Sequence, residues 1–170
     1  RDGSLSESRR HLERAAKSND QKPVALLELG QVYERLDYLK KAEVCFRQCI
    51  QSAPGLTAAW QGALRVAESL GKVAEVRRLA EEFANACPDS VEAMLTVADF
   101  YSRESNFEEA GRRLDAALAL EPNKLAVRLN RAEISQKLGR LGQAVEDLSI
   151  AHSISPDSAE IAFQLAGVNA

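Results

Sequence analysis

The chain is poor in the residues that most catalytic and metal sites need. Its 170 residues include two histidines, three cysteines, one tryptophan, five prolines and nine glycines. The histidines, His11 and His152, lie near opposite ends of the sequence, and there is no phosphate-binding glycine loop or nucleophile elbow. No apolar run approaches the ~18 residues that a membrane span needs. The sequence therefore predicts neither an enzyme nor direct membrane insertion.

An excess of positive charge is also missing. The formal net charge is −3 at pH 7 and the isoelectric point is about 5.5. Nucleic-acid-binding proteins carry a strongly basic footprint, so we expect no nucleic-acid partner. Arginine pairs recur at Arg9-Arg10, Arg77-Arg78 and Arg112-Arg113, but glutamates surround them, which is typical of a solvated surface of mixed charge.

Two of the cysteines have a spacing that a metal site could use. Cys45 and Cys49 are four residues apart, which places both on one side of a helix. No third or fourth ligand accompanies them, and a free cysteine behaves as a small hydrophobic residue. We therefore predict that they belong to a core, and that the chain holds no metal and no cofactor.

Proline is the most regular feature that is present. Pro54, Pro88, Pro122 and Pro156 follow one another at intervals of 34 residues. Self-similarity at such a period is the signature of a repeat architecture. If each proline is placed at position 32 of a unit, full units cover residues 23–56, 57–90, 91–124 and 125–158. Positions 4, 7, 8 and 11 of each unit then share one helix face, and positions 20, 24 and 27 share a face of a second helix.

The residues at these positions carry a resemblance. The first unit has Leu26, Leu29, Gly30, Tyr33, Ala42, Phe46, Cys49 and Pro54, and the third has Met94, Val97, Ala98, Tyr101, Ala110, Leu114, Ala117 and Pro122. This pattern resembles the tetratricopeptide-repeat family. The resemblance implies an all-α, right-handed superhelical solenoid of antiparallel helical hairpins.

The two ends of the chain also fit the register. Residues 1–20 match the second helix of a preceding repeat, and residues 159–170 match the first helix of a following one. We expect one array over residues 1–170, with four full repeats and a half repeat at each end. Because the chain starts and stops inside units, we expect it to be a piece of a longer protein.

The resemblance also implies where a partner binds. In this family, positions 5, 9 and 12 of each first helix lie on the concave groove. Transferred to this sequence, these positions and their neighbours give a partner-binding groove of Leu27, Gln31, Glu34, Gln61, Arg65, Glu68, Leu95, Asp99, Ser102, Leu129, Glu133 and Phe163. At position 5 the leucines and the phenylalanine form an apolar stripe of the kind that a peptide or helix needs. The alternative is that neighbouring helices bury part of this stripe.

One tryptophan and two arginines need a separate interpretation. Trp60 occupies the family's core tryptophan position, so we predict that it packs. Arg128 and Arg131 lie where apolar residues are usual, so they must reach solvent or bind carboxylates. With Asn130 and Asp147 they resemble the repeats of chaperone-binding cofactors, which favours a structural role, and a ligand-binding role stays open.

The resemblance implies a non-catalytic protein–protein interaction scaffold. A clamp for chaperone tails is excluded because Leu27 and Gln31 stand where its lysine and asparagine belong. Two alternatives stay open: a regulatory or targeting segment of a larger enzyme or of a secretion or polysaccharide-export assembly, and a homo-oligomerisation module that pairs through uncapped ends. Three cysteines at non-framework spacing favour a reducing compartment such as the cytoplasm. A bacterial periplasm stays open if the chain belongs to an export or pilus assembly.

Overall fold

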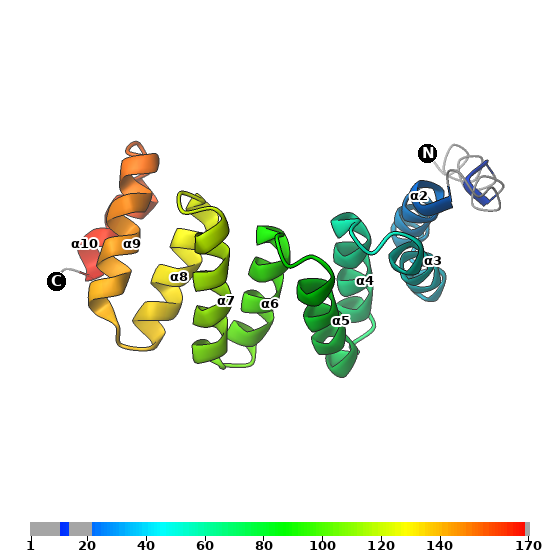
Figure 1. Cartoon of the computed structure of the whole chain (residues 1–170), viewed down its shortest axis with the longest axis horizontal. Helices are drawn as coiled ribbons and strands as arrows, with labels where there is room; N and C mark the ends of the chain where they lie inside the picture. Colours follow the sequence, from blue (N-terminus) through cyan, green and yellow to red (C-terminus); the bar gives the residue numbers. More distant parts are fainter. Residues whose placement is uncertain (1–10, 14–21, 169–170) are drawn as a thin grey trace. The chain divides into compact units, whose positions relative to one another are not determined.

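The computed structural model describes residues 11–13 and 22–168. Within these ranges the chain is all-α and has no strand. The helices are α2 (Lys22–Arg35), α3 (Leu39–Ser52), α4 (Thr57–Ser69), α5 (Val73–Ala86), α6 (Val91–Arg103), α7 (Phe107–Leu120), α8 (Leu125–Lys137), α9 (Leu141–Ile154) and α10 (Ala159–Val168) (Figure 1). The helix predicted over residues 1–20 lies outside the described residues, apart from a helical stretch at 11–13.

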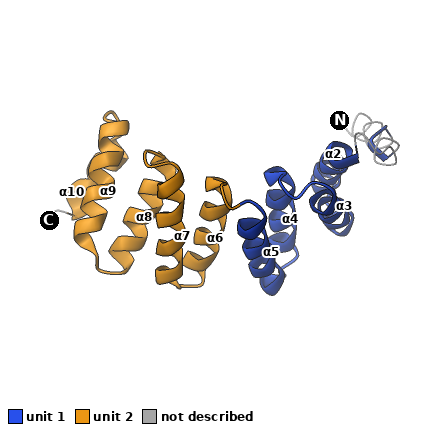
Figure 2. Ribbon diagram, viewed as in Figure 1, with its two compact units in different colours: residues 1–87 blue, residues 88–170 orange. Residues whose placement is uncertain are grey.

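Consecutive helices pack against each other in hairpins. The described residues form the hairpins α2–α3, α4–α5, α6–α7 and α8–α9, and α10 packs against α9. The all-α solenoid of helical hairpins is therefore confirmed. The hairpins divide into two compact units, residues 1–87 and residues 88–170, each with two hairpins (Figure 2). We call them unit 1 and unit 2. One continuous array over the whole chain stays a prediction.

None of the helices in the described ranges has the length and apolar character that crossing a bilayer requires.

Every first helix ends in the same way. Position 15 of each repeat has a positive φ, at Asp37 (59°), Gly71 (68°), Ser105 (58°) and Gly139 (71°). The next amide closes the turn by donating to a carbonyl five residues back, as from Tyr38 N to Tyr33 O at 2.8 Å. These are the bonds of a Schellman motif, in which a left-handed residue terminates the helix. The same left-handed turn therefore recurs every 34 residues, at the same interval as the prolines.

This turn gives a first prediction. Gly71→Ala is expected to destabilise the fold by about 1–2 kcal/mol, because an L-residue in the left-handed region is strained. A Cβ at Gly71 would meet nothing within 4 Å, so the loss is conformational rather than steric. Ser105→Gly, the reverse change, is expected to gain less than about 1 kcal/mol. Midpoints of urea unfolding followed by helical circular dichroism measure both effects.

The control for this prediction is Gly55→Ala. Gly55 lies in a turn, its φ is outside the left-handed region, and a Cβ there also has open space. A Gly71→Ala midpoint no lower than that of Gly55→Ala would show that the left-handed turn contributes nothing to stability.

The second helices provide much of the core. Positions 20 and 27 are buried in every repeat, and they hold Ala42, Cys49, Val76, Phe83, Ala110, Ala117, Ala144 and Ala151. Trp60 is 4% exposed and stacks on Phe83 with ring centroids 5.7 Å apart. Its indole Nε1 donates to the carbonyl of Pro54 at 2.7 Å. The predicted packing role of Trp60 is confirmed, because both the ring and its polar edge are satisfied inside unit 1.

The closest helix packing in unit 1 surrounds Phe46. Its side chain is fully buried, and its ring lies against Gly30 of α2 and Gly62 of α4. A Cβ would lie 2.7 Å from the ring at Gly30 and 2.5 Å at Gly62, which is closer than real side chains come. Glycine at both positions therefore lets one aromatic ring fill the space between α2, α3 and α4.

Candidate functional site

In unit 1, the predicted groove residues come from α2 and α4. Two of them form an ion pair: Arg65 Nε lies 2.9 Å from Glu34 Oε1, and Arg65 Nη2 lies 3.1 Å from Glu34 Oε2. Hydrogen bonding to Glu34 raises the pKa of Arg65 above its ordinary value. Gln31 and Gln61 are half-buried and Glu68 is exposed. The polar centre of this surface is thus occupied by the chain's own guanidinium.

In unit 2, three predicted groove residues line one cavity. Asp99 and Ser102 come from α6 and Glu133 from α8, and they surround a space of ≈ 70 Å³. Asn130 joins the polar lining, and the apolar lining consists of Ala98, Leu114 and Ile134. The fold therefore brings together side chains from two consecutive repeats, as the register predicts for a shared face.

The predicted apolar stripe is largely used by the core. Leu27 packs against the cluster of Leu26, Cys49 and Ala59, and Leu129 packs against Ala132, Ala144 and Leu148. Leu95 is also half-buried. Phe163 on α10 differs, because 81% of its surface is exposed. For Leu27 and Leu129, burial by neighbouring helices accounts for the apolar residue.

Arg128 and Arg131 find the carboxylate that the sequence requires. Asp147 of α9 is completely buried. Arg128 Nη1 donates to its Oδ1 at 2.7 Å, and Arg131 donates through Nε to Oδ2 at 2.7 Å and through Nη2 to Oδ1 at 2.8 Å. Two guanidinium groups thus satisfy one buried carboxylate, which accounts for both arginines structurally.

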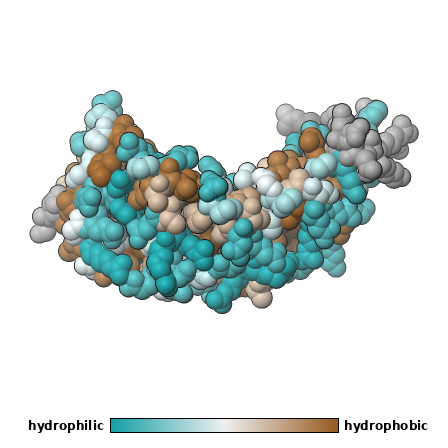
Figure 3. All heavy atoms as spheres, viewed as in Figure 1, coloured by the Kyte–Doolittle hydropathy of each residue, from teal (hydrophilic) through white to brown (hydrophobic). Residues whose placement is uncertain are grey.

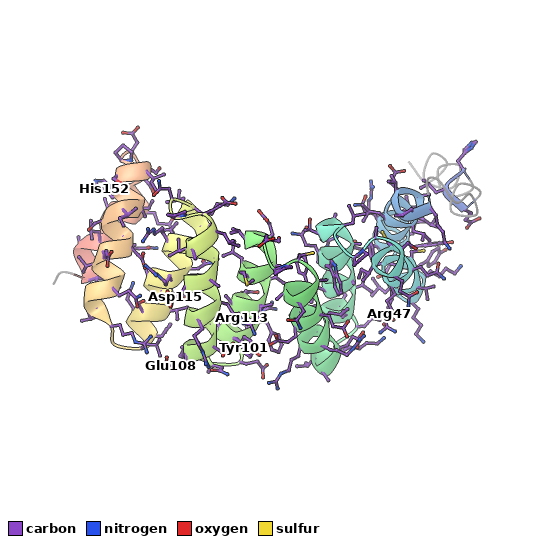
Figure 4. All side chains as sticks on the ribbon, viewed as in Figure 1. Arg47, Tyr101, Glu108, Arg113, Asp115 and His152 are labelled. Atoms are coloured by element: carbon purple, nitrogen blue, oxygen red, sulfur yellow. The ribbon has the colours of Figure 1, made fainter. Side chains whose placement is uncertain are left out.

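The same arginines extend the network to the rest of unit 2. Arg128 Nε donates to the carbonyl of Pro122 at 2.9 Å, at the turn before α8. Arg131 Nη1 donates to Asp115 of α7 at 2.7 Å (Figure 4). Hydrogen bonds to Asp147 and then to Asp115 raise the pKa of Arg131. The network therefore ties α7, α8 and α9 together.

The comparisons with known proteins agree with the fold of helical hairpins. Residues 24–55 match the family description "Tetratricopeptide repeat". The structure of a tetratricopeptide repeat protein from Parabacteroides merdae superimposes with a TM-score of 0.76 at 16% identity, covering 98% of this chain and 66% of that one. The chain has the tetratricopeptide-repeat fold. It thus spans just under two thirds of the length of that relative.

Two further structures share the fold. YrrB, described as a tetratricopeptide-repeat protein with an unusual peptide-binding site, aligns with a TM-score of 0.72 at 14% identity, covering 92% of this chain and 81% of that one. TTC0263, a tetratricopeptide-repeat protein of Thermus thermophilus, aligns with a TM-score of 0.66 at 20% identity, covering 98% of this chain and 91% of that one. No curated protein matches the sequence significantly.

The second helices of these tetratricopeptide repeats carry a surface of mixed charge. In unit 1, Arg47 on α3 binds Glu43 and Glu75, and Arg78 on α5 binds Glu75 at 2.7 Å (Figure 4). Hydrogen bonds from Arg78 and then Arg47 lower the pKa of Glu75. Hydrophilic side chains cover most of the visible surface over α5 (Figure 3).

Unit 2 repeats this arrangement. Arg112 and Arg113 on α7 both bind Glu109, at 2.5 Å and 3.1 Å. Figure 3 shows hydrophilic side chains over α7 as well. The arginines of the Arg112-Arg113 pair therefore sit in a mixed-charge surface and form no basic stripe.

The thiols of the tetratricopeptide core are buried. Cys45, Cys49 and Cys87 are free cysteines, and Cys49 Sγ donates to the carbonyl of Pro23 at 3.1 Å. Burial raises the pKa of all three thiols, that of Cys45 to about 11. They therefore stay protonated near neutral pH. Over residues 11–13 and 22–168, no group of three histidine, cysteine or acidic side chains is placed to hold a metal ion.

Several residues of the site were not among the predicted groove residues. Leu114 and Asn130 line the cavity of unit 2, and Asp115 completes the arginine network. Leu114 and Asn130 stand at positions where unit 1 has Phe46 and Gly62. Leu114 and Asn130 could have been identified by comparing the repeats with each other rather than with the family pattern.

Proposed function

We propose that this chain is a non-catalytic protein–protein interaction scaffold that binds a peptide or helical segment of a partner on the first helices of its repeats. The observation that carries the proposal is the shared cavity of unit 2, where Asp99, Ser102 and Glu133 converge from α6 and α8. Binding sites of small segments are typically concave, with an apolar wall and a few converging polar groups.

The fold supports this proposal. Repeat solenoids present extended surfaces that are assembled from equivalent positions of consecutive repeats. A structurally similar protein, YrrB, is described as binding a peptide at an unusual site, which is consistent with a peptide site on this fold.

The exposed Phe163 adds an apolar anchor in the same unit. It occupies position 5 of α10, the position that Leu129 occupies in the preceding repeat. Burying a phenylalanine side chain contributes about 1.5–3 kcal/mol. Apolar burial at Phe163 would thus supply binding energy, and the polar cavity would set register and specificity.

Selection from a random-peptide display library tests the proposal. We expect wild-type protein to enrich peptides whose synthetic versions bind saturably in calorimetry. Binding should be lost with the double variant Ser102→Arg/Glu133→Arg, because both side chains lie at the cavity and large cations would fill it. Glu146→Arg is the matched control, because Glu146 is an exposed carboxylate on α9 that does not line the cavity.

Two results would contradict the proposal. Enriched peptides that bind the double variant and wild type equally would place the binding surface elsewhere. Failure to enrich any peptide, together with a mass that rises with protein concentration, would instead favour self-assembly. Circular dichroism of each variant confirms that the helices are retained.

A further inference from the structure

The same place between consecutive first helices is filled in unit 1 and hollow in unit 2. In unit 1 the Phe46 ring fills the space between Gly30 and Gly62, and the Glu34–Arg65 ion pair lies on the first helices beside it. The space between these two glycines is therefore occupied by the chain's own aromatic ring.

Five of the seven residues that line the cavity of unit 2 stand two repeats after a residue of this filled site. Leu114 replaces Phe46, Ala98 replaces Gly30 and Asn130 replaces Gly62. Leu114 is smaller than Phe46, and Asp99, Ser102 and Glu133 are shorter than Gln31, Glu34 and Arg65 at the same repeat positions, whereas Ala98 and Asn130 add atoms. The hollow is thus a consequence of substitutions at defined repeat positions.

The charge differs at the same positions. Ser102 replaces Glu34 and Glu133 replaces Arg65, so unit 2 has a serine and a carboxylate where unit 1 has a carboxylate and a guanidinium. Asp99 also lines the cavity and binds Arg103 on its own helix. Across the described part of the chain, Glu133 has no ion-pair partner. A carboxylate with no counter-charge therefore lines this cavity at the repeat position where unit 1 carries the guanidinium of Arg65.

We propose that the cavity of unit 2 receives a lysine or arginine side chain of the bound peptide, which supplies the cation that Arg65 supplies in unit 1. This inference rests on the proposed function. Ala98, Leu114 and Ile134 offer an apolar wall for the methylenes of such a side chain, and Glu133 and Asp99 accept its charged hydrogen bonds. Ser102 and Asn130 provide the remaining polar contacts.

Peptide pools with one fixed central residue test this assignment. The probes are short randomised peptides with lysine, arginine, glutamine or glutamate at the centre, and affinity is measured by fluorescence anisotropy. We expect the lysine and arginine pools to bind at least about tenfold more tightly than the glutamine pool, because a hydrogen bond to a charged group contributes more than a neutral one. The preference should shrink as salt is added.

Variants test whether the preference for lysine and arginine arises at Glu133. Glu133→Gln should reduce the tenfold preference to about twofold or less, because it keeps the size of the side chain and removes the charge. Glu146→Gln, the same change on α9 away from the cavity, should leave it intact. Glu133→Arg places an arginine at the repeat position of Arg65, and we expect it to fill the cavity and abolish the preference.

The outcomes separate the two proposals. Equal binding of basic and neutral pools, or a preference that Glu133→Gln leaves unchanged, would overturn the cation site and leave the scaffold function standing. Absence of binding by every pool would contradict the scaffold function and the cation site together.

Discussion

Replacing Asp147 by alanine is expected to destabilise unit 2 by about 3–5 kcal/mol, the cost of removing one partner of a buried ion pair. Asp147 is completely buried and accepts three hydrogen bonds from Arg128 and Arg131. Without it, two guanidinium groups at the centre of the α8–α9 hairpin lose their counter-charge. The midpoint of urea unfolding, followed by helical circular dichroism, measures the loss.

Asp115→Ala is the matched control for this prediction. Asp115 binds the same guanidinium of Arg131 at 2.7 Å, but its side chain is 56% exposed. Exposed ion pairs contribute about 1 kcal/mol or less, so this variant should stay close to wild type. A triple variant with Leu at 128 and 147 and Met at 131 should recover most of the loss, because apolar replacement of a buried ionic group is often neutral or stabilising. Equal midpoints for Asp147→Ala and Asp115→Ala would show that burial of the carboxylate does not increase its contribution to stability.

The fold could be predicted from the sequence because its determinants lie within one repeat. The turn at position 15 depends on local conformation, as at Gly71 and Gly139, and the proline interval marks the exit of each hairpin. Small residues at position 20 of each hairpin could be located by helical periodicity alone. None of these features requires knowledge of how one repeat meets the next.

The candidate site could be predicted only in part, because it lies where repeats meet. Periodicity places Leu27 and Leu129 on the same helix face as Phe163, but it does not say that the neighbouring helix covers the first two. The contact of Arg131 with Asp115 likewise joins different repeats, so it cannot be predicted from the spacing of residues within one repeat. Asp147 could be suggested as a partner because it lies in the same hairpin as both arginines.

The packing around Phe46 yields the second large effect, because it too depends on a contact between repeats. Gly62→Ala is expected to destabilise unit 1 by about 1–3 kcal/mol through overpacking. A Cβ at Gly62 would lie 2.5 Å from Cε1 and Cζ of the Phe46 ring, which is fully buried. The direction of this change in stability is informative, because alanine in a helix interior is normally more stable than glycine by about 0.5–1 kcal/mol.

Gly111→Ala tests whether packing, rather than helix propensity, makes Gly62→Ala destabilising. Gly111 is also a buried glycine within a helix, but a Cβ there would meet Ile134 at 3.8 Å, an ordinary contact. We therefore expect Gly111→Ala to be neutral or stabilising in urea unfolding, whereas Gly62→Ala is destabilising. Loss of stability in both variants, or in neither, would contradict the packing argument.

Phe46→Leu in the Gly62→Ala background connects this packing to the cavity of unit 2. Leu114 holds the same repeat position beside Asn130, so a leucine there is compatible with a side chain at the position of Gly62. We expect the double variant to lose less stability than the sum of the losses from Gly62→Ala alone and Phe46→Leu alone. The leucine relieves the clash that the alanine creates, and the alanine fills part of the void that the leucine leaves. Simple additivity of the two losses would mean that the ring and the glycine do not act as one unit, and that the hollow in unit 2 has another origin.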